Sequence, residues 1–373
     1  MAEKKLGLIV NPVAGLGGRV GLKGSDGEAI QRQARARGAK PQAGERAERA
    51  IRRLASHRQT FQLITYPAEM GEVPARRAGL AAQVVGAIQP GRTTPQDTQR
   101  AAREMQELGV GLLLFAGGDG TARDIYAALG EGMPALGIPA GVKIHSATFA
   151  ITPEAAGELA AAWLTATIPT RSAEVMDIDE TAFRQGRVSA RLCGYLRVPF
   201  RRNLVQAAKS PSPAGEEADQ EAIAIEVARR LQPGWCYLLG PGTTTRAIAA
   251  HLGLEKSLLG VDVICDGCLI ARDVDERQLL EVIEGRKAKI ILTPIGGQGH
   301  ILGRGNQPIS PSVLQKVGPE GLVVVSTRQK IDALRGAPLR VDSGDPGLDR
   351  QLSGYTRVIT GYGEECVYRV SNG

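Results

Sequence analysis

The chain has 373 residues, of which 43% are hydrophobic, 23% charged and 4% aromatic, and its formal net charge is +7. This length and composition fit a globular protein of two domains, and no apolar run approaches the roughly 20 residues that cross a bilayer, so we expect no membrane partner. The positive charge favours an anionic ligand, and zinc-finger spacings and aromatic-rich basic motifs are lacking, so we expect a small-molecule nucleotide as partner and no nucleic acid.

Short apolar runs alternate with helical patterns in the first part of the chain. The runs that we predict as strands are residues 5–10, 60–67, 110–118 and 134–141. Helical patterns at 45–54 and 95–108 lie between them, and Thr94, Pro95 and Asp97 form a helix start of the capping-box type. Strands that alternate with helices indicate a parallel sheet. We therefore predict an α/β protein with a Rossmann-like nucleotide-binding domain over residues 1–165.

The pattern changes after about residue 170. Two segments with period-two alternation, separated by Arg-Gln-Gly, predict a β-hairpin, and a polar loop follows at 209–220. Further predicted strands begin near residues 235, 287 and 321. We predict a β-rich second domain over residues 166–350, and we expect the strand-like segment 351–373 to return to the first domain.

Gly-Gly-Asp-Gly-Thr follows the third predicted strand and opens a helix. Glycines at 117, 118 and 120 let backbone amides approach a ligand, and the helix N-terminus attracts an anion. Asp119 is unsuited to contact a phosphate, so it must face a hydroxyl or a magnesium ion, and both belong to phosphoryl transfer. A plain helix cap is the structural alternative. We expect Asp119 to be catalytic, and Gly117, Gly118, Gly120 and Thr121 to bind the nucleotide.

A second glycine-rich segment follows the first predicted strand. Asn11 ends that strand, and six glycines lie between residues 15 and 27. The spacing is neither GxGxxG nor the Walker pattern, but open α/β sheets bind nucleotides at this place. We assign Asn11, Gly15, Gly17 and Lys23 to nucleotide binding, with a flexible surface loop as the alternative.

Other polar segments follow strands and are candidates for ligand contacts. Glu69 and Met70 follow the second strand, where a ribose is often held. Lys143 and His145 follow the fourth strand, and their charges could neutralise a transferring phosphate. Arg304, in a long glycine-rich loop, is a candidate phosphate clamp, although a hairpin at a domain interface fits that loop equally well.

The turn Pro-Gly-Thr-Thr-Thr at 241–245 lies between a predicted strand and a predicted helix. Its backbone amides and hydroxyls suit a second phosphate group. We therefore assign Gly242, Thr243, Thr244 and Thr245 to nucleotide binding, on the wall of the cleft opposite Asp119.

Together these motifs resemble the ATP-NAD kinase family, whose superfamily includes diacylglycerol and sphingosine kinases. The resemblance lies in the strand that ends in Asn-Pro, in Gly-Gly-Asp-Gly-Thr about a hundred residues later, and in "GPGTTT" and "IGGQGHILGRGNQPISP", which resemble an AcoX-like bacterial and archaeal branch. It implies that Asp119 approaches the hydroxyl that accepts the phosphoryl group. The Asn-Glu pair and the tyrosine of the second motif that typical members carry are missing, and Asp177 and Asp179 lie near the place of the pair.

This resemblance implies a kinase that uses ATP or polyphosphate with magnesium, and NAD as the leading acceptor at its adenosine 2′-hydroxyl. The alternatives are a kinase of another metabolite or lipid hydroxyl, and a regulator that binds NAD or ATP without chemistry. A homodimer is expected by analogy with the family.

Five cysteines lie in no dense framework, and Cys265 and Cys268 form a lone CxxC. A zinc site needs further ligands at similar spacing, so we expect reduced thiols and no metal held by protein ligands alone. The N-terminus lacks the apolar region of a signal peptide. We therefore expect a cytoplasmic protein.

Overall fold

Five parallel strands form the sheet of the first domain, in the order β3-β2-β1-β4-β5. The strands are β1 (Lys4–Val10), β2 (Phe61–Thr65), β3 (Gln83–Val84), β4 (Leu112–Gly117) and β5 (Ala135–Pro139). β1 and β4 are apolar and buried because helices cover both faces of the sheet. The four predicted strands are confirmed, and β3 is a short exposed edge strand without an apolar signal.

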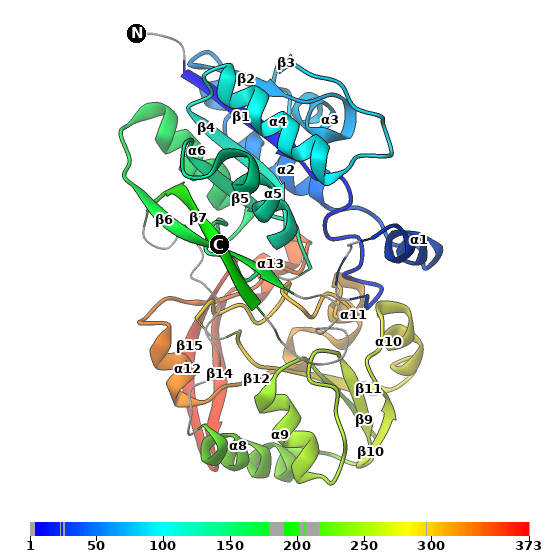
Figure 1. The fold of residues 1–373 in the computed structure, drawn as a ribbon. Coiled ribbons are helices and arrows are strands. Elements are labelled where there is room, and N and C mark those ends of the chain that lie inside the picture. Colours follow the sequence, from blue (N-terminus) through cyan, green and yellow to red (C-terminus); the bar gives the residue numbers. More distant parts are fainter. Residues whose placement is uncertain are drawn as a thin grey trace.

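In the computed structural model, a second domain lies below the first (Figure 1). The structure describes only part of the chain. The described residues are 4–22, 24, 27–142, 144–178, 190–201, 204–205, 216–295 and 297–372. Lys23, Lys143 and Asp179, which the sequence singled out, lie outside them.

In the described residues, six α-helices accompany the first sheet. They are α1 (Glu28–Ala36), α2 (Ala43–Arg52), α3 (Glu72–Arg77), α4 (Pro95–Glu107), α5 (Asp119–Leu129) and α6 (Pro153–Thr165), with short 3-10 turns η1 (Ala55–His57) and η2 (Ala68–Met70). α2 packs with α6 and α4 with α5, as expected for right-handed crossovers that cover opposite faces. The capping box predicted at Thr94 and Asp97 is present.

A long antiparallel hairpin follows α6 and confirms the predicted one. It consists of β6 (Thr170–Ile178) and β7 (Ala190–Pro199). β6 packs against α5 and β7 against β5, and inward side chains such as Val175 and Leu196 belong to the first domain's core. The packing of the first domain therefore extends beyond the predicted boundary at residue 165.

The second domain contains an eight-stranded mixed sheet in the order β10-β9-β8-β11-β12-β14-β15-β13. Its strands are β8 (Trp235–Leu239), β9 (Asp262–Cys265), β10 (Cys268–Ala271), β11 (Lys287–Leu292), β12 (Leu322–Val325), β13 (Leu339–Arg340), β14 (Gly354–Gly361) and β15 (Glu364–Ser371). β14 pairs with β12, and β15 pairs with β14 and β13. The expectation that the last segment returns to the first domain is therefore wrong, because a hairpin keeps both strands in the second sheet.

Helices cover both faces of this second sheet. They are α8 (Glu217–Arg230), α9 (Thr243–His251), α10 (Glu276–Val282), α11 (Pro311–Val317), α12 (Arg328–Ala333) and α13 (Pro346–Leu352), with a 3-10 turn η3 (Pro319–Gly321). Successive residues of β8 point to opposite faces, so Leu238 joins the core with α10 and α11, whereas Leu239 joins the core with α8 and α9. The second domain is thus a three-layered unit.

Two cysteines that we expected to be reduced form a disulfide bond. Cys236 on β8 and Cys265 on β9 lie opposite each other in antiparallel register and form a disulfide. The expectation of reduced cysteines is wrong for this pair, while Cys268 remains free. In the described part of the chain, no helix is long and apolar enough to span a bilayer.

Candidate functional site

The strand order of the first sheet reverses between β1 and β4, and the two predicted glycine-rich motifs meet there. From β1 the chain proceeds to β2 on one side, and from β4 it proceeds to β5 on the other. Ligands of open α/β sheets bind at the carboxyl ends of strands at such a switch point. Asn11 follows β1, and its Nδ2 donates a hydrogen bond of 2.9 Å to Oγ1 of Thr121.

The Gly-Gly-Asp-Gly-Thr segment forms a tight turn from β4 into α5. Gly117 ends the strand, extended Gly118 is the N-cap, and the helix begins at Asp119. A side chain on Gly117 would overlap that of Thr121, so the turn needs glycine there. The first amides of a helix lack intrahelical acceptors and carry the positive end of its dipole, so this end of α5 suits an anion.

The carboxylate of Asp119 is buried and held by the loop that follows β5. Its Oδ2 accepts a hydrogen bond from the His145 amide (2.8 Å). Its Oδ1 accepts from the amide (3.0 Å) and the hydroxyl (2.6 Å) of Ser146. The His145 ring lies beside it, with Nδ1 3.3 Å from Oδ2. A carboxylate has about four acceptor positions, so capacity for one more donor remains on Oδ2.

Asp119 and Thr121 line a pocket of about 1070 Å³. It is lined by loop residues after β1, β4 and β5, and by arginines of α1 and of the loop before α4. The charged lining residues are Glu28, Arg32, Arg35, Arg92, Asp119, Arg123, Asp124 and Asp177. Typical small-molecule pockets have volumes of about 300–1000 Å³, so this one has room for a nucleotide.

Several predicted site residues line this pocket. They are Asn11, Gly15, Gly118, Asp119, Gly120 and Thr121. Gly117 is not among the lining residues and instead allows the tight turn from β4 into α5. Gly17 is buried and shapes the glycine-rich loop, because a side chain there would overlap the carbonyl of Gly24.

The two candidates after β2 have separate roles. Met70 is fully buried in the first domain's core, so its assignment to substrate binding is wrong. The η2 turn directs it inward, which its position after a strand did not reveal. Glu69 does not line the pocket, but it accepts a hydrogen bond from the amide of Gly91, which does.

The Pro-Gly-Thr-Thr-Thr turn begins α9 in the second domain, as predicted. Lys330 Nζ donates to Oγ1 of Thr244 (3.1 Å), and Gln220 Nε2 donates to Oγ1 of Thr243 (3.3 Å). Thr245 donates to the carbonyl of Gly240 (2.6 Å). Among the residues that the structure describes, none of this turn lines the pocket that contains Asp119.

Lys330, which the sequence did not single out, lies buried beside this turn. Burial lowers the pKa of its ammonium group, and the charge of Glu216 opposes that shift. Its Nζ lies 3.8 Å from a carboxylate oxygen of Glu216. The sequence could not predict the burial of Lys330, because no motif distinguishes a lysine in a short helix from one that is exposed to solvent.

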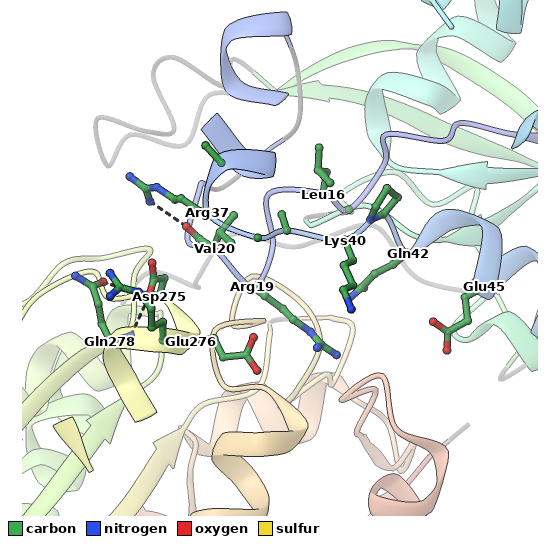
Figure 2. A pocket seen from close by; sticks show the side chains of 16 residues that line it. Leu16, Arg19, Val20, Arg37, Lys40, Gln42, Glu45, Asp275, Glu276 and Gln278 are labelled. Carbon is green, nitrogen blue, oxygen red and sulfur yellow. Dashed lines mark hydrogen bonds between the residues drawn. The ribbon is translucent and has the colours of Figure 1, made fainter. Parts of the chain in front are cut away.

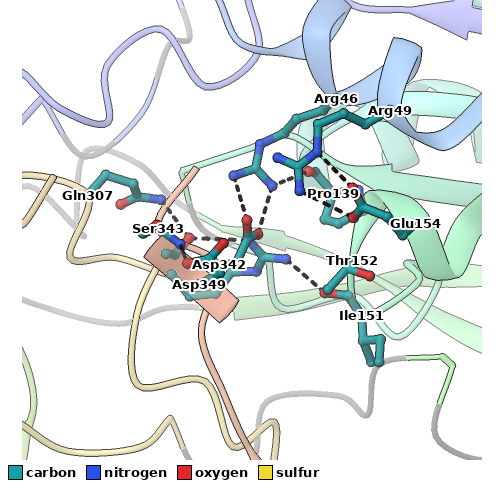
Figure 3. A network of polar contacts seen from close by, with 12 residues as sticks. Arg46, Arg49, Pro139, Ile151, Thr152, Glu154, Gln307, Asp342, Ser343 and Asp349 are labelled. Atoms are coloured by element: carbon teal, nitrogen blue, oxygen red, sulfur yellow. Dashed lines mark hydrogen bonds and ion pairs between the residues drawn. The ribbon is translucent and has the colours of Figure 1, made fainter. Parts of the chain in front are cut away.

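Arg304 is buried and binds Asp342, which lies in the polar network between the domains that Figure 3 shows. Its Nη1 lies 2.9 Å from Oδ2 of Asp342, and its Nη2 donates to the carbonyl of Ile151 (3.3 Å). Arg46 of α2 binds the same carboxylate at 2.7 and 3.1 Å. The assignment of Arg304 as a phosphate clamp is therefore wrong in this structure, because its guanidinium group forms an ion pair with Asp342 and only 3% of the residue is exposed.

A second pocket of about 850 Å³ adjoins the first, and Gly15 lines both. Figure 2 shows it between the glycine-rich loop, the segment after α1 and the start of α10. Arg19 and Lys40 extend into the space between the domains, as does Glu276 (Figure 2). The Glu276 amide donates to the carbonyl of Arg19 (3.0 Å), so the glycine-rich loop also contacts the second domain.

The carboxylates of the first pocket do not form a ready-made metal cage. The described residues contain no group of three or more metal-ligating side chains. Magnesium in phosphoryl-transfer sites usually keeps several waters and binds phosphate oxygens with only one or two carboxylates. Asp124 and Asp177 line the pocket and are compatible with that mode.

Two family models match the chain. The model of the ATP-NAD kinase N-terminal domain matches residues 6–168, and the model of the ATP-NAD kinase C-terminal domain matches residues 233–370. Together they span the sheet with the Asp119 motif and the sheet with the threonine-rich turn. No curated protein matches the chain.

Similarity to solved structures is weak. A Bacillus anthracis protein assigned as a diacylglycerol kinase is 16% identical, with a TM-score of 0.25, over 48% of this chain and 42% of that one, so the chain spans about two fifths of its length. A solute-binding protein of an ABC transporter from Rhodopseudomonas palustris is 13% identical, with a TM-score of 0.28, over 95% and 68% of the two chains. These scores are too low to support any conclusion about function.

Proposed function

The chain belongs to the ATP-NAD kinase family, and from that membership we propose that it transfers a phosphoryl group from ATP, or from polyphosphate, to the adenosine 2′-hydroxyl of NAD. The observation that carries the proposal is the position of Asp119. This carboxylate lies at the switch point of the sheet, in a pocket of nucleotide size, and at the helix end that favours phosphate.

In the proposed reaction, Asp119 contacts the acceptor hydroxyl through Oδ2. That oxygen has capacity for one more donor, so it can orient the hydroxyl and accept its proton. In the same step the hydroxyl oxygen bonds to the terminal phosphorus, and the bond from that phosphorus to the bridging oxygen breaks, so that ADP or shortened polyphosphate leaves. The Ser146 contacts on Oδ1 keep the carboxylate from rotating. Positioning of this kind supplies much of the catalysis in phosphoryl transfer.

The phosphate groups are proposed to lie at the N-terminus of α5. The amides of Gly120 and Thr121 are available there, and Asn11 fixes the Thr121 hydroxyl. Bound magnesium would neutralise phosphate charge, and the pocket-lining carboxylates that would hold it are Asp124 and Asp177, both of which pair with Arg123 in this structure. Gly242–Thr245 remain a proposed second phosphate contact, which requires a ligand that reaches across from the first domain.

A different soluble acceptor is the second candidate. Two observations favour it: the chain has no Asn-Glu pair, and Asp177, near the place of that pair, is bound by Arg123 at 3.2 and 3.3 Å. An acceptor that does not need a carboxylate at this place would leave that ion pair intact.

Product mass distinguishes these candidates. The protein is incubated with magnesium and either ATP or polyphosphate, together with NAD, NADH or a panel of hydroxylated metabolites. A gain of about 80 Da on NAD, the mass of one phosphoryl unit, supports the first candidate. A gain on another compound alone supports the second, and no gain on any compound contradicts a kinase. A homodimer and a cytoplasmic location remain predictions, and sedimentation of the purified protein tests the former.

A further inference from the structure

One peptide unit of the first domain links Asp119 to the second domain. This unit joins Ile144 to His145. Its N–H donates to Oδ2 of Asp119 at 2.8 Å, and its carbonyl accepts a hydrogen bond from Nε2 of Gln298 at 3.0 Å. A peptide unit is planar and rigid, so the direction of its carbonyl fixes the direction of its N–H.

Gln298 belongs to the glycine-rich loop that follows β11, and its side chain is buried. The same loop contacts a second carbonyl of the first domain, two residues earlier, because Val142 O accepts from the Gly305 amide (3.1 Å) and from Nε2 of Gln307 (2.6 Å). Three hydrogen bonds of the second domain therefore meet the segment formed by Val142 and residues 144–146, which also provides both amides on Asp119.

The other side of this segment is tied to the first domain. The Gly141 amide donates to the carbonyl of Gly117, and the Ala147 amide donates to the carbonyl of Glu174, each at 2.9 Å. The ends of the segment are thus fixed, whereas the Ile144 carbonyl between them receives its hydrogen bond from Gln298. The orientation of this peptide is therefore coupled to the second domain through Gln298.

We propose that Gln298 is a positioning residue for phosphoryl transfer, acting on the Asp119 carboxylate through the Ile144–His145 peptide. This inference rests on the proposed kinase function. When the second domain is docked, Gln298 holds the peptide with its N–H toward Oδ2. Without that donor, the carbonyl loses the hydrogen bond that ties it to the second domain, and the N–H of the same peptide is held less firmly toward the Asp119 oxygen proposed to face the acceptor hydroxyl. Hydrogen bonds in such a chain also polarise one another.

Two variants of Gln298 and one matched control test the link. Gln298→Met keeps the length of the side chain but removes the donor. Gln298→Asn keeps an amide but is too short to reach the Ile144 carbonyl, and it covers the case in which the methionine variant fails to fold. Gln307→Met removes a hydrogen bond of the same kind between the same segments, but Val142 O keeps its bond from Gly305 and its peptide does not reach Asp119.

The first readout is amide hydrogen exchange of the ligand-free protein, followed by mass spectrometry on peptides that cover residues 142–150. We expect exchange of the His145 region to be about tenfold faster in both Gln298 variants, as for loss of one hydrogen bond, and to be unchanged in Gln307→Met and in β4. Equal exchange in the Gln298 variants and the control would overturn the link.

The second readout is steady-state kinetics with the acceptor found by product mass. We expect kcat to fall by about 10–100-fold in both Gln298 variants with KM for the phosphoryl donor changed less than about threefold, as for a misplaced reacting group. A fall shared equally by Gln307→Met would overturn the proposal, since it would reflect general loosening of the domains. If the unmodified protein transfers no phosphoryl group, the kinase function fails, while the exchange readout still decides whether Gln298 orients this peptide.

Discussion

Replacing Asp342 by asparagine tests the charge network that holds the two domains together. Asp342 follows β13 in the second domain and accepts hydrogen bonds from Arg46 of the first domain and Arg304 of the second. The asparagine has nearly the same shape but no charge. The change therefore leaves two buried guanidinium groups without a counterion and creates no cavity.

The size of the effect follows from burial. Arg46 and Arg304 are only 7% and 3% exposed, so water does not replace the lost carboxylate. Removing one partner of a buried ion pair typically costs about 3–5 kcal/mol of stability. We expect a loss of about 3 kcal/mol, at the lower end, because the asparagine oxygen still accepts one hydrogen bond.

The pH dependence has a defined sign. Burial alone would raise the pKa of the Asp342 carboxyl, but the charges of Arg46 and Arg304 outweigh it and hold the pKa well below its usual range. A carboxyl with a lowered folded-state pKa stabilises the protein above its unfolded pKa of about 3.9, and that contribution is lost as the pH falls. The difference in stability between the native chain and Asp342→Asn should therefore shrink as the pH is lowered from about 5 to about 2.

Urea denaturation measures both effects, and the two tryptophans report on separate domains. Trp163 lies on α6 of the first domain and Trp235 on β8 of the second. Asp349→Asn is the matched control, because Asp349 is a buried carboxylate near the network whose hydrogen bond is with the Ser343 amide (2.8 Å). We expect the control to lose about 1 kcal/mol. A loss below about 1 kcal/mol for Asp342→Asn, or equal losses for the two variants, would refute the reasoning.

Two further changes test the nucleotide site and the helix ends. Gly117→Ala places a methyl group against the side chain of Thr121 and should separate Thr121 from Asn11. Because one hydrogen bond is displaced, we expect ATP to bind about tenfold more weakly in isothermal titration calorimetry. Unchanged affinity would argue that Thr121 has no role in binding. Thr152→Ala removes the hydroxyl that caps α6 at the Ala155 amide and should lower the free energy of unfolding by about 1 kcal/mol in urea without changing kcat; a changed kcat would show that this cap is part of the site.

The first domain and the core of the site could be predicted because the signals are local. Each strand of the parallel sheet is an apolar run, and the polar residues that follow β1 and β4 must meet at one edge of the sheet. This is why Asn11 and Thr121, 110 residues apart, could be assigned to one site before their hydrogen bond was seen.

The errors concern residues whose environment depends on distant partners. Arg304 resembles a phosphate ligand in a glycine-rich loop, but Asp342 neutralises it from a segment with no recognisable motif. Cys236 and Cys265 form a disulfide because β8 and β9 are antiparallel in one particular register, which spacing in the sequence does not give. Gln298 could not be singled out in the sequence, because its contact with the Ile144 carbonyl exists only between the two packed domains.

The most direct test of the kinase proposal is a single-turnover experiment with Asp119→Asn. The variant and the native chain are each mixed with ATP, magnesium and NAD, and the formation of NADP is followed by mass while the affinities for ATP and NAD are measured separately. We predict that the variant binds both ligands within about threefold of the native chain, while its rate of transfer falls by about 10²–10⁴-fold, as for loss of a general base. A variant that transfers phosphate at the native rate would contradict the role assigned to this carboxylate.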